Sequence, residues 1–490
     1  MVFSDLFFIF CFIPVFGLLY LLCGRIDRLR QYFKEKRNPD SSLKRPMLFR
    51  NIVLTIFSIL FYAWGEPVYV FLMLAVVLVN YFCGILMYRK EKTAIGKFWL
   101  IFGVAADLAA LASFKYLGFF TGIVRNFGID LPDPQIALPI GISFYIFQSI
   151  SYLIDVYRTE SKPQRNYFDL LLYISMFPQL IAGPIVRYGT VAKEITHRSA
   201  NADDVANGVY RFIIGLGKKV VIANIMGEIA TSLLGGSLDN MSAAAAWVGI
   251  LAFSIQIYFD FSGYSDMAIG IGRCVGFHFP ENFNHPYTCT SMTDFWRRWH
   301  ISLGSFFRDY VYIPMGGNRR HQALNIMTVW FLTGMWHGAS WNFIIWGVYF
   351  GLIIMIEKYT LLKWKVPKIG LYVYSIFLIL VGWGLFYFDD FGRMSQFFTA
   401  MFGFNEPQGL PMHVESVLID NLWLWVAALI LCLPVRGKIE RLGTYTASKI
   451  PGVGNYAVQF CHAFVSIVIL ICCVALLVGA TNNAFIYTRF

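Results

Sequence analysis

The sequence predicts an all-α polytopic membrane protein, and three observations support this fold class. Only 14% of its 490 residues are charged and 57% are apolar, whereas a soluble domain carries about 25% charged residues. The mean hydropathy is +0.58. Apolar runs of about 20 residues, the length that crosses a bilayer as a helix, recur along the whole chain. We therefore expect about ten to twelve transmembrane helices, with re-entrant or interfacial helices between them.

The same composition excludes several other classes of protein. A disordered chain needs low hydrophobicity and high charge, and a membrane β-barrel shows short segments of alternating polarity instead of long apolar runs. The excess of 40 Lys and Arg over 29 Asp and Glu gives a net charge of +11. In a membrane protein such cations gather in cytoplasmic loops beside anionic lipid. We therefore expect a lipid bilayer around the chain and no nucleic-acid partner.

The first apolar run, Leu6 to Cys23, is not followed by a small-residue cleavage site, so we expect a retained helix rather than a signal peptide. The loop at residues 25–50 then carries nine Lys or Arg against three Asp or Glu. The positive-inside rule places such a loop in the cytoplasm. The N-terminus is therefore expected on the extracytoplasmic side.

Four further helices follow from this orientation. They are expected near residues 51–64, 68–88, 98–115 and 136–156. The connections at residues 89–97 and 158–165 are again basic, and both fall on the same side as the first basic loop. This agreement supports the direction assigned to each helix.

Beyond residue 167 the apolar pattern is interrupted by prolines, glycines and lysines, namely Pro178, Gly183, Pro184, Lys218 and Lys219. Such interruptions at membrane depth need protein or water around them, so we expect re-entrant segments here. Long apolar runs resume at residues 243–261, 342–356, 372–388, 421–433 and 457–480. The sequence has no repeat of fixed period and no low-complexity tract. One integral membrane domain over residues 1–490 is therefore expected.

The cysteines and histidines do not form the patterns of a metal centre or a disulfide framework. Most of the nine cysteines lie within apolar runs, and no CxxC pair occurs. No two histidines have the spacing of a helical metal-binding pair. We therefore expect no bound metal. His278 and His285 flank a Pro-Asn loop and are expected to fix that loop.

The densest group of polar residues lies between residues 260 and 337. Within it, apolar residues recur every three or four positions from Phe295 to Tyr310, which predicts an amphipathic helix at the membrane interface. Thr293 or Asp294 is expected to cap the start of this helix. His300 lies on the same predicted helix.

His337 lies between Trp336 and Gly338, in a segment made otherwise of apolar and small residues. An ionisable residue inside a membrane is a functional candidate, because burying a charge there is costly. Desolvation keeps a buried imidazole neutral, and a neutral imidazole can accept a hydroxyl proton as a general base. The alternative is a histidine that only forms hydrogen bonds within a helix bundle. The residues themselves leave both interpretations open.

Asp260 lies at the end of the apolar run at residues 243–261, and Asp266 follows six residues later. One interpretation is a proton relay or a cation site, and the other is hydrogen bonding that braces an interrupted helix. The first interpretation suits an ion-coupled transporter. The sequence has no visible inverted repeat, which weighs against a transporter.

Six segments of the chain resemble the membrane-bound O-acyltransferase family, in particular its bacterial alginate O-acetyltransferase branch. They are SFYIFQSISYLIDVYR (143–158), FPQLIAGPIVRY (177–188), FSGYSDMAIGIG (261–272), ENFNHPY (281–287), DFWRRWHISLGSFFRDYVYIPMGGNR (294–319) and MWHGASWNFIIWG (335–347). These segments lie within residues 143–351, which we call the motif core. Several long segments in the same order and spacing make the resemblance specific.

The resemblance implies a ring of tilted helices around a central tunnel, with a catalytic histidine in the Trp-His-Gly segment at His337. A second histidine of the family falls on His300, 337 − 300 = 37 residues earlier. It also implies a cytoplasmic acyl donor, which we expect to be acetyl-coenzyme A, and no tightly bound cofactor. Four arginines are candidates to bind the donor phosphates, and anchoring to anionic lipid is an equal alternative for them: Arg297, Arg298, Arg319 and Arg320.

The activity that the resemblance implies is O-acetylation of an extracytoplasmic, alginate-like polysaccharide by an enzyme of the bacterial cytoplasmic (inner) membrane. A separate extracytoplasmic partner of the serine–glycine–asparagine–histidine (SGNH) hydrolase type is expected to dock near residues 389–420. The D-alanyl transferase branch, which modifies teichoic acids, shares the same segments and is the alternative within the family. An ion-coupled transporter and a catalytically inactive scaffold for an exporter are the alternatives outside it.

Overall fold

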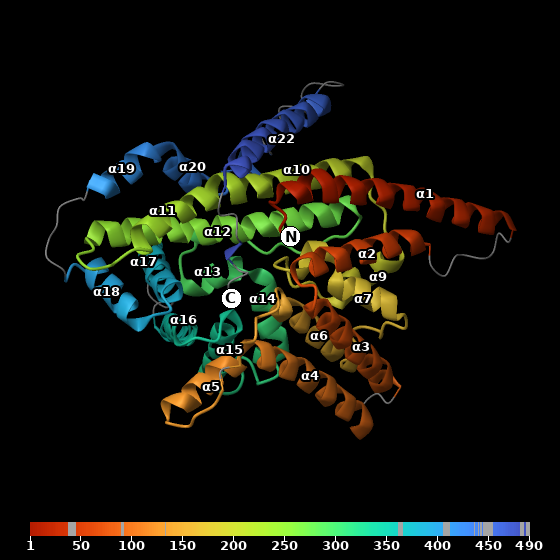
Figure 1. Ribbon diagram of the computed structural model, residues 1–490, viewed down its shortest axis with the longest axis horizontal. Helices are drawn as coiled ribbons and strands as arrows, with labels where there is room; N and C mark the ends of the chain where they lie inside the picture. The colour runs from red at the N-terminus through yellow and green to blue at the C-terminus, as the bar shows by residue number, and fades with distance from the viewer. Residues whose placement is uncertain are drawn as a thin grey trace. The chain divides into compact units, whose positions relative to one another are not determined.

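The protein is all-α, as its sequence predicts. The computed structural model describes residues 1–37, 46–89, 93–132, 134–360, 366–404, 412–435, 437–439, 441, 443, 454–480 and 485–486, and it has no strand among them (Figure 1). Eight helices of this described part are long and apolar enough to cross a membrane, or nine if the bent pair α19–α20 forms one span. Three further helices, α6, α10 and α15, have 16 residues each, fewer than the ~20 that a full crossing needs.

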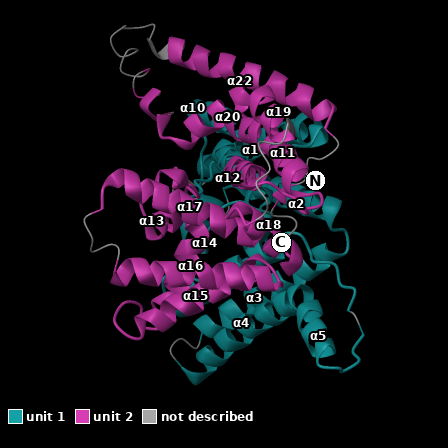
Figure 2. Ribbon diagram, turned by 90° about the vertical axis from the view of Figure 1, so that its left-hand side faces the viewer, with its two compact units in different colours: residues 1–212, 265–280, 487–489 teal, residues 213–264, 281–486, 490 magenta. Residues whose placement is uncertain are grey.

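The chain divides into two compact units, which Figure 2 colours teal and magenta. Among the described residues, those within 1–212 and 265–280 belong to unit 1, and those within 213–264 and 281–486 belong to unit 2. Helices α10 (Ala202–Gly217) and α12 (Ala243–Cys274) contribute residues to both units. The expectation that residues 1–490 act as one domain stays a prediction.

Unit 1 holds the helices of the first part of the chain. They are η1 (Phe8–Phe12), α1 (Ile13–Arg37), α2 (Leu48–Gly65), α3 (Tyr69–Tyr88), α4 (Ala94–Lys115), α5 (Leu117–Asn126), α6 (Ile142–Tyr157), α7 (Tyr167–Ser175), α8 (Phe177–Leu180) and α9 (Tyr188–Thr196). Helix α6 packs against α3 and α4, and nearly all of its residues are buried. It therefore forms the centre of unit 1.

Helix α6 begins six residues later than predicted, at Ile142 instead of Ile136. The residue before it, Gly141, has a left-handed backbone with φ +75°, and a Cβ there would lie 2.9 Å from the Leu180 carbonyl oxygen. Pro139 also disfavours helical geometry in the residue before it. Local backbone chemistry thus sets the start of α6, although the apolar run begins earlier.

Unit 2 holds the later helices. Besides parts of α10 and α12 they are η2 (Lys218–Asn224), α11 (Ile225–Leu234), η3 (Pro286–Thr288), α13 (Met292–Arg298), α14 (Ile301–Phe307), η4 (Arg308–Tyr312), α15 (Gln322–His337), α16 (Trp341–Tyr359), α17 (Lys368–Tyr387), α18 (Phe391–Met401), α19 (Met412–Asp420), α20 (Leu422–Cys432) and α22 (Gly454–Val478). The interruption expected at Lys218 and Lys219 is a π-helical stretch, η2, which continues from α10 into α11.

Helices α15 and α16 form a hairpin in which small residues bring the two backbones together (Figure 1). A Cβ on Gly334 would overlap the Phe343 carbonyl, and one on Gly347 would overlap the Trp330 carbonyl. Close approach at glycine is a common way for helices to pack inside a membrane. The hairpin places the end of α15 beside the start of α16.

The single amphipathic helix predicted from Phe295 to Tyr310 is wrong. The structure has three pieces there, α13, α14 and η4, and the chain leaves the helix at Trp299 and His300. The N-cap is Ser291, whose side chain accepts the backbone N–H of Asp294, and neither expected capping residue takes this role. Apolar residues do recur with a helical period here, but long-range contacts of His300 interrupt the helix.

Candidate active site

His337 is the last residue of α15 and lies at the tip of the α15–α16 hairpin in unit 2. Its side chain is buried, with 3% of the residue exposed. The ring centroid of Trp346 lies 5.0 Å from that of the imidazole, and the ring of Phe386 lies 5.3 Å away, both nearly perpendicular. Aromatic walls therefore surround the imidazole that the sequence singled out.

His300 connects α13 to α14 and is also buried in unit 2, with 2% exposed. Its backbone is left-handed, with φ +45° and ψ +54°. Such a conformation costs a non-glycine residue on the order of 1–3 kcal/mol, and it persists where the surrounding structure imposes it, often at functional sites. The ring of Phe261 meets the imidazole edge-on, with centroids 4.6 Å apart. The conformation and burial together mark His300 as a candidate functional residue.

Trp336 contacts both histidines. Its ring centroid lies 5.6 Å from that of His300 and 4.9 Å from that of His337. The structure thus brings the two predicted catalytic residues, 37 positions apart in sequence, to the same indole ring within unit 2.

Asn282 is a contributor to this site to which the sequence assigned no role. It lies 1% exposed, and its Oδ1 accepts hydrogen bonds from the Ser302 backbone N–H (3.1 Å) and the Ser302 hydroxyl (2.9 Å). Nδ1 of His300 lies 3.2 Å from the same oxygen. The residue belongs to the ENFNHPY segment, but its link to His300 spans 18 positions and is not visible in any local pattern.

Glu357 is the second residue that the sequence interpretation missed. It is a buried carboxylate of α16 that accepts the backbone N–H groups of Met292 (2.5 Å) and Thr293 (3.0 Å), at the start of α13. A carboxylate is a strong acceptor for the open N–H groups of a helix start. The available signal was an acidic residue inside an apolar run, because such residues are rare in membranes.

The four predicted donor-binding arginines belong to α13 and to the loop before α15. Arg297, Arg319 and Arg320 are exposed. Arg298 is half-buried and pairs with Asp294 on its own helix at 2.8 Å. The structure therefore leaves three of these guanidinium groups at the surface, while the fourth supports its own helix.

Asp260 and Asp266 each pair with a different cation. Asp260 pairs with Lys219 of η2 in unit 2, with 2.5 Å between Nζ and Oδ1. Asp266 pairs with Arg211 of α10 in unit 1 at 2.8 Å. Because each carboxylate has a cation of its own, the bracing interpretation is favoured over a shared relay.

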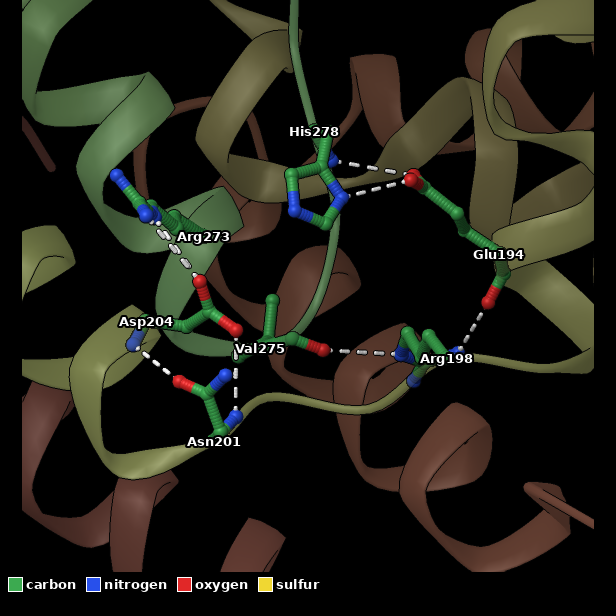
Figure 3. Close-up of polar contacts among 7 residues, drawn as sticks. All are labelled: Glu194, Arg198, Asn201, Asp204, Arg273, Val275 and His278. Carbon is green, nitrogen blue, oxygen red and sulfur yellow. Dashed lines mark hydrogen bonds and ion pairs between the residues drawn. The ribbon is translucent and has the colours of Figure 1, made fainter.

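Figure 3 shows a polar network in unit 1 that fixes the chain where α12 ends. Glu194 of α9 accepts the backbone N–H of His278 (3.1 Å) and contacts its Nδ1 (2.8 Å). Arg198 donates to the Val275 carbonyl at 3.1 Å. The expectation that His278 fixes its loop is confirmed. His285 contacts the Cys432 carbonyl at 3.3 Å in unit 2.

No group of three or more His, Cys, Asp or Glu is placed to hold a metal ion within the part of the chain that the structure describes. Two imidazoles, the amide of Asn282 and aromatic rings lie around Trp336. These groups suit proton transfer at a buried site.

Comparison with known proteins gives matches over most of the chain. A family model described as MBOAT, membrane-bound O-acyltransferase family, matches residues 158–369. A protein named probable alginate O-acetylase AlgI, from Azotobacter vinelandii, is 40% identical over 83% of this chain and 79% of its own length. The peptidoglycan O-acetyltransferase of Helicobacter pylori is 34% identical over 83% of this chain and 80% of its own length.

A more distant relative represents the other branch that the sequence suggested. The teichoic acid D-alanyltransferase of Bacillus subtilis is 29% identical over 44% of this chain and 58% of its own length. Its likeness is thus weaker and shorter than that of the two O-acetyltransferases.

Proposed function

Because the chain belongs to the membrane-bound O-acyltransferase family, we propose that it carries an acetyl group from a cytoplasmic thioester to hydroxyl groups of an extracytoplasmic polysaccharide. It is a multi-pass membrane protein and an O-acyltransferase. The choice of acetyl and of a glycan rests on the two closer relatives, whose names both describe O-acetyl transfer to a polysaccharide. The cytoplasmic (inner) membrane and an extracytoplasmic N-terminus belong to the same proposal.

The observation that carries this proposal is the position of His337, at the C-terminal end of α15 and among aromatic rings. In the proposed step, His337 takes the proton of the acceptor hydroxyl while that oxygen attacks the thioester carbonyl. The C–O bond forms, the C–S bond breaks, and the thiolate then takes the proton from the imidazolium. The C-terminal end of a helix favours a positive charge, so it stabilises this transient imidazolium.

The dry surroundings of His337 support the same role. Aromatic walls exclude water, and this strengthens electrostatic interactions and protects the acyl group from hydrolysis. General-base catalysis of this kind typically contributes about 10²–10⁴ in rate. Holding the hydroxyl and the thioester in line contributes further, because the reaction then becomes effectively unimolecular.

Acetyl-coenzyme A is the proposed donor. Three exposed arginines, Arg297, Arg319 and Arg320, support this choice, because guanidinium groups bind phosphates in bidentate geometry. Lys358 lies near them and donates to Asn318 of the same loop at 2.9 Å. Arg298 supports α13 instead, through its pair with Asp294.

The acceptor reaches this site either as a glycan or through a partner. An extracytoplasmic partner of the SGNH-hydrolase type is proposed to dock near residues 389–420, which include α18 and α19. Residues 405–411 of this region lie outside the described part of the chain. D-alanyl transfer to teichoic acid is the less favoured alternative, because that relative matches only 44% of the chain.

Purified protein in proteoliposomes tests this function. Labelled acetyl-coenzyme A is supplied on one side and short alginate oligosaccharides are enclosed on the other, and free thiol and acetylated sugar are both measured. We expect His337→Ala to lower both products by about 10²–10⁴. His197→Ala, which changes an exposed histidine at the end of α9, outside the proposed docking region, serves as the matched control.

The rival functions give different results in the same experiment. Movement of label without release of thiol would identify a carrier. Full turnover in the His337→Ala variant would overturn the proposed chemistry. Mass spectrometry of envelope polymers from a strain that lacks the gene identifies the acyl group and the polysaccharide that carries it.

A further inference from the structure

Asn282 holds the segment that contains His300 through its side chain and its backbone. Besides the contacts of its Oδ1, its carbonyl accepts the Ile301 backbone N–H at 3.0 Å. Two residues further on, the Asn284 N–H donates to the Arg298 carbonyl at 2.9 Å. Residues 282–284 and 298–302 are therefore bonded together on both sides of His300, and this pairing imposes its left-handed backbone.

The contacts of Asn282 also identify which of its two amide atoms faces His300. A backbone N–H can only donate, so the atom that receives the Ser302 N–H must be the oxygen, Oδ1. The Ser302 hydroxyl gives its proton to the same oxygen at 2.9 Å. The hydroxyl oxygen of Ser302 lies 3.5 Å from Nδ1 of His300. Because its hydrogen points to Asn282, this oxygen can only accept a hydrogen bond from the ring.

Both polar atoms beside Nδ1 of His300 are therefore acceptors, and Nδ1 must carry the hydrogen. In a neutral imidazole the other nitrogen, Nε2, then has a lone pair and no hydrogen. His300 lies between α13 and α14, which are both too short to span a membrane. Burial lowers the pKa of His300 and keeps its ring neutral at pH 7.

We propose that Asn282 is a positioning residue that locks His300 in the Nδ1–H tautomer, so that Nε2 accepts a hydrogen bond from a substrate hydroxyl. The inference rests on the proposed acyl transfer and deepens it. It excludes one role for His300, because a nitrogen without hydrogen cannot donate to the oxygen of the thioester carbonyl. His300 instead accepts from a second hydroxyl of the acceptor sugar and so orients the neighbouring hydroxyl whose proton His337 removes, since both imidazoles contact Trp336.

A change of charge at Asn282 makes this role measurable. Two charged groups of unit 2 are adjacent in sequence to residues that contact the imidazole. Asp260, which pairs with Lys219, precedes Phe261, and Glu281 precedes Asn282. The groups in contact with the imidazole include Phe261, Trp336, Asn282 and Ser302, and these four are uncharged. A carboxylate introduced at residue 282 therefore adds a charge that directly faces Nδ1.

Two variants test the proposal in the proteoliposome assay with acetyl-coenzyme A and alginate oligosaccharides. Asn282→Ala removes the acceptor, and we expect kcat to fall by about 10–100-fold while the KM for acetyl-coenzyme A stays within about threefold. Asn282→Asp keeps an acceptor for the Ser302 N–H, the Ser302 hydroxyl and the Nδ1–H of His300. We therefore expect this variant to have most of the wild-type kcat at high pH. Its negative charge stabilises the imidazolium, so the pKa of His300 rises and the acidic limb of the kcat profile moves to higher pH by about 1 unit or more.

Asn80→Ala is the matched control, because Asn80 is equally buried but bonds to Val76 and Asp107 in unit 1. A purely structural role would give Asn282→Ala the same modest effect as Asn80→Ala and would leave the acidic limb of Asn282→Asp unmoved. Either result overturns the proposal, and if Asn282→Ala does not fold, the pH profile of Asn282→Asp decides alone. An active His337→Ala in this assay would instead refute the proposed function itself.

Discussion

The ion pair formed by Lys219 and Asp260 in unit 2 is almost fully buried. Their side chains are 5% and 1% exposed. The second carboxylate oxygen of Asp260 accepts the Ile486 N–H at 2.8 Å. The ring of Phe485 lies 4.7 Å from that of Tyr264. One carboxylate therefore holds η2, α12 and the segment at residues 485–486 together.

Loss of Lys219 should be costly at this position. Lys219→Met leaves Asp260 buried without its cation, and we expect the free energy of unfolding to fall by about 3–5 kcal/mol. The double variant Lys219→Met/Asp260→Leu should recover most of this loss, because no isolated charge remains. Thermal unfolding in detergent micelles measures both, with the exposed Lys97→Met as control. Equal stability of Lys219→Met and the control would contradict the role assigned to the pair.

At the residue scale, the sequence predicted the two histidines but not the groups that position them. His337 and His300 stand in segments that resemble a known family, so each could be named without a structure. The contacts of Asn282 with His300 and Ser302 join residues 18 and 20 positions apart, and those of Glu357 with Met292 join residues 65 apart. Local patterns carry no information on such pairs, so only a folded chain reveals them.

At the scale of elements, the α15–α16 hairpin depends on glycine. Gly334 faces the Phe343 carbonyl and Gly347 faces the Trp330 carbonyl, with no room for a side chain at either place. Because His337 is one turn beyond Gly334, a change in helix spacing moves the imidazole directly.

Gly334→Ala should therefore affect both folding and catalysis. The added methyl group must push α16 away, and overpacking of this kind costs about 1–3 kcal/mol. We expect lower thermal stability and a lower kcat, measured on the same preparation. Gly370→Ala on α17 is the matched control, because its Cβ would lie 3.5 Å from Val366, an ordinary contact. Wild-type values for Gly334→Ala would show that the hairpin tolerates wider spacing.

The long apolar helices were predictable because their patterns are local. Helix α3 begins and ends within one residue of the predicted range, and α2 differs by only a few residues. The predicted interfacial helix failed for the opposite reason. Its apolar period continues through His300, but the backbone bonds from residues 282–284 force that residue into a left-handed conformation. Tertiary contacts thus decide where α13 ends.

At the scale of the whole molecule, the distribution of basic loops predicts which side of the membrane each connection faces. Residue 162 lies in an exposed basic loop after α6, and residue 129 is an exposed position between α5 and α6. The positive-inside rule assigns the first to the cytoplasm and the second to the outside.

Cysteine labelling tests this topology. Lys162→Cys and Ile129→Cys are exposed to a membrane-impermeant maleimide in intact cells and in inverted membrane vesicles. We expect Ile129→Cys to label in cells and Lys162→Cys in inverted vesicles. The wild-type chain, with its nine free cysteines, gives the background. The reverse pattern would turn the molecule over and place the N-terminus in the cytoplasm.

The backbone contacts of the α15–α16 hairpin bear on how the protein can be handled outside the cell. Apolar association gains little inside lipid, so an interface that holds there relies on close fit and short-range attraction. The contacts at Gly334 and Gly347 are of this kind and do not depend on which amphiphile surrounds the molecule. Extraction into a mild surfactant should therefore preserve the geometry around residue 337. If activity is lost during purification, we expect the cause to be the loss of substrates and not a collapse of the catalytic centre.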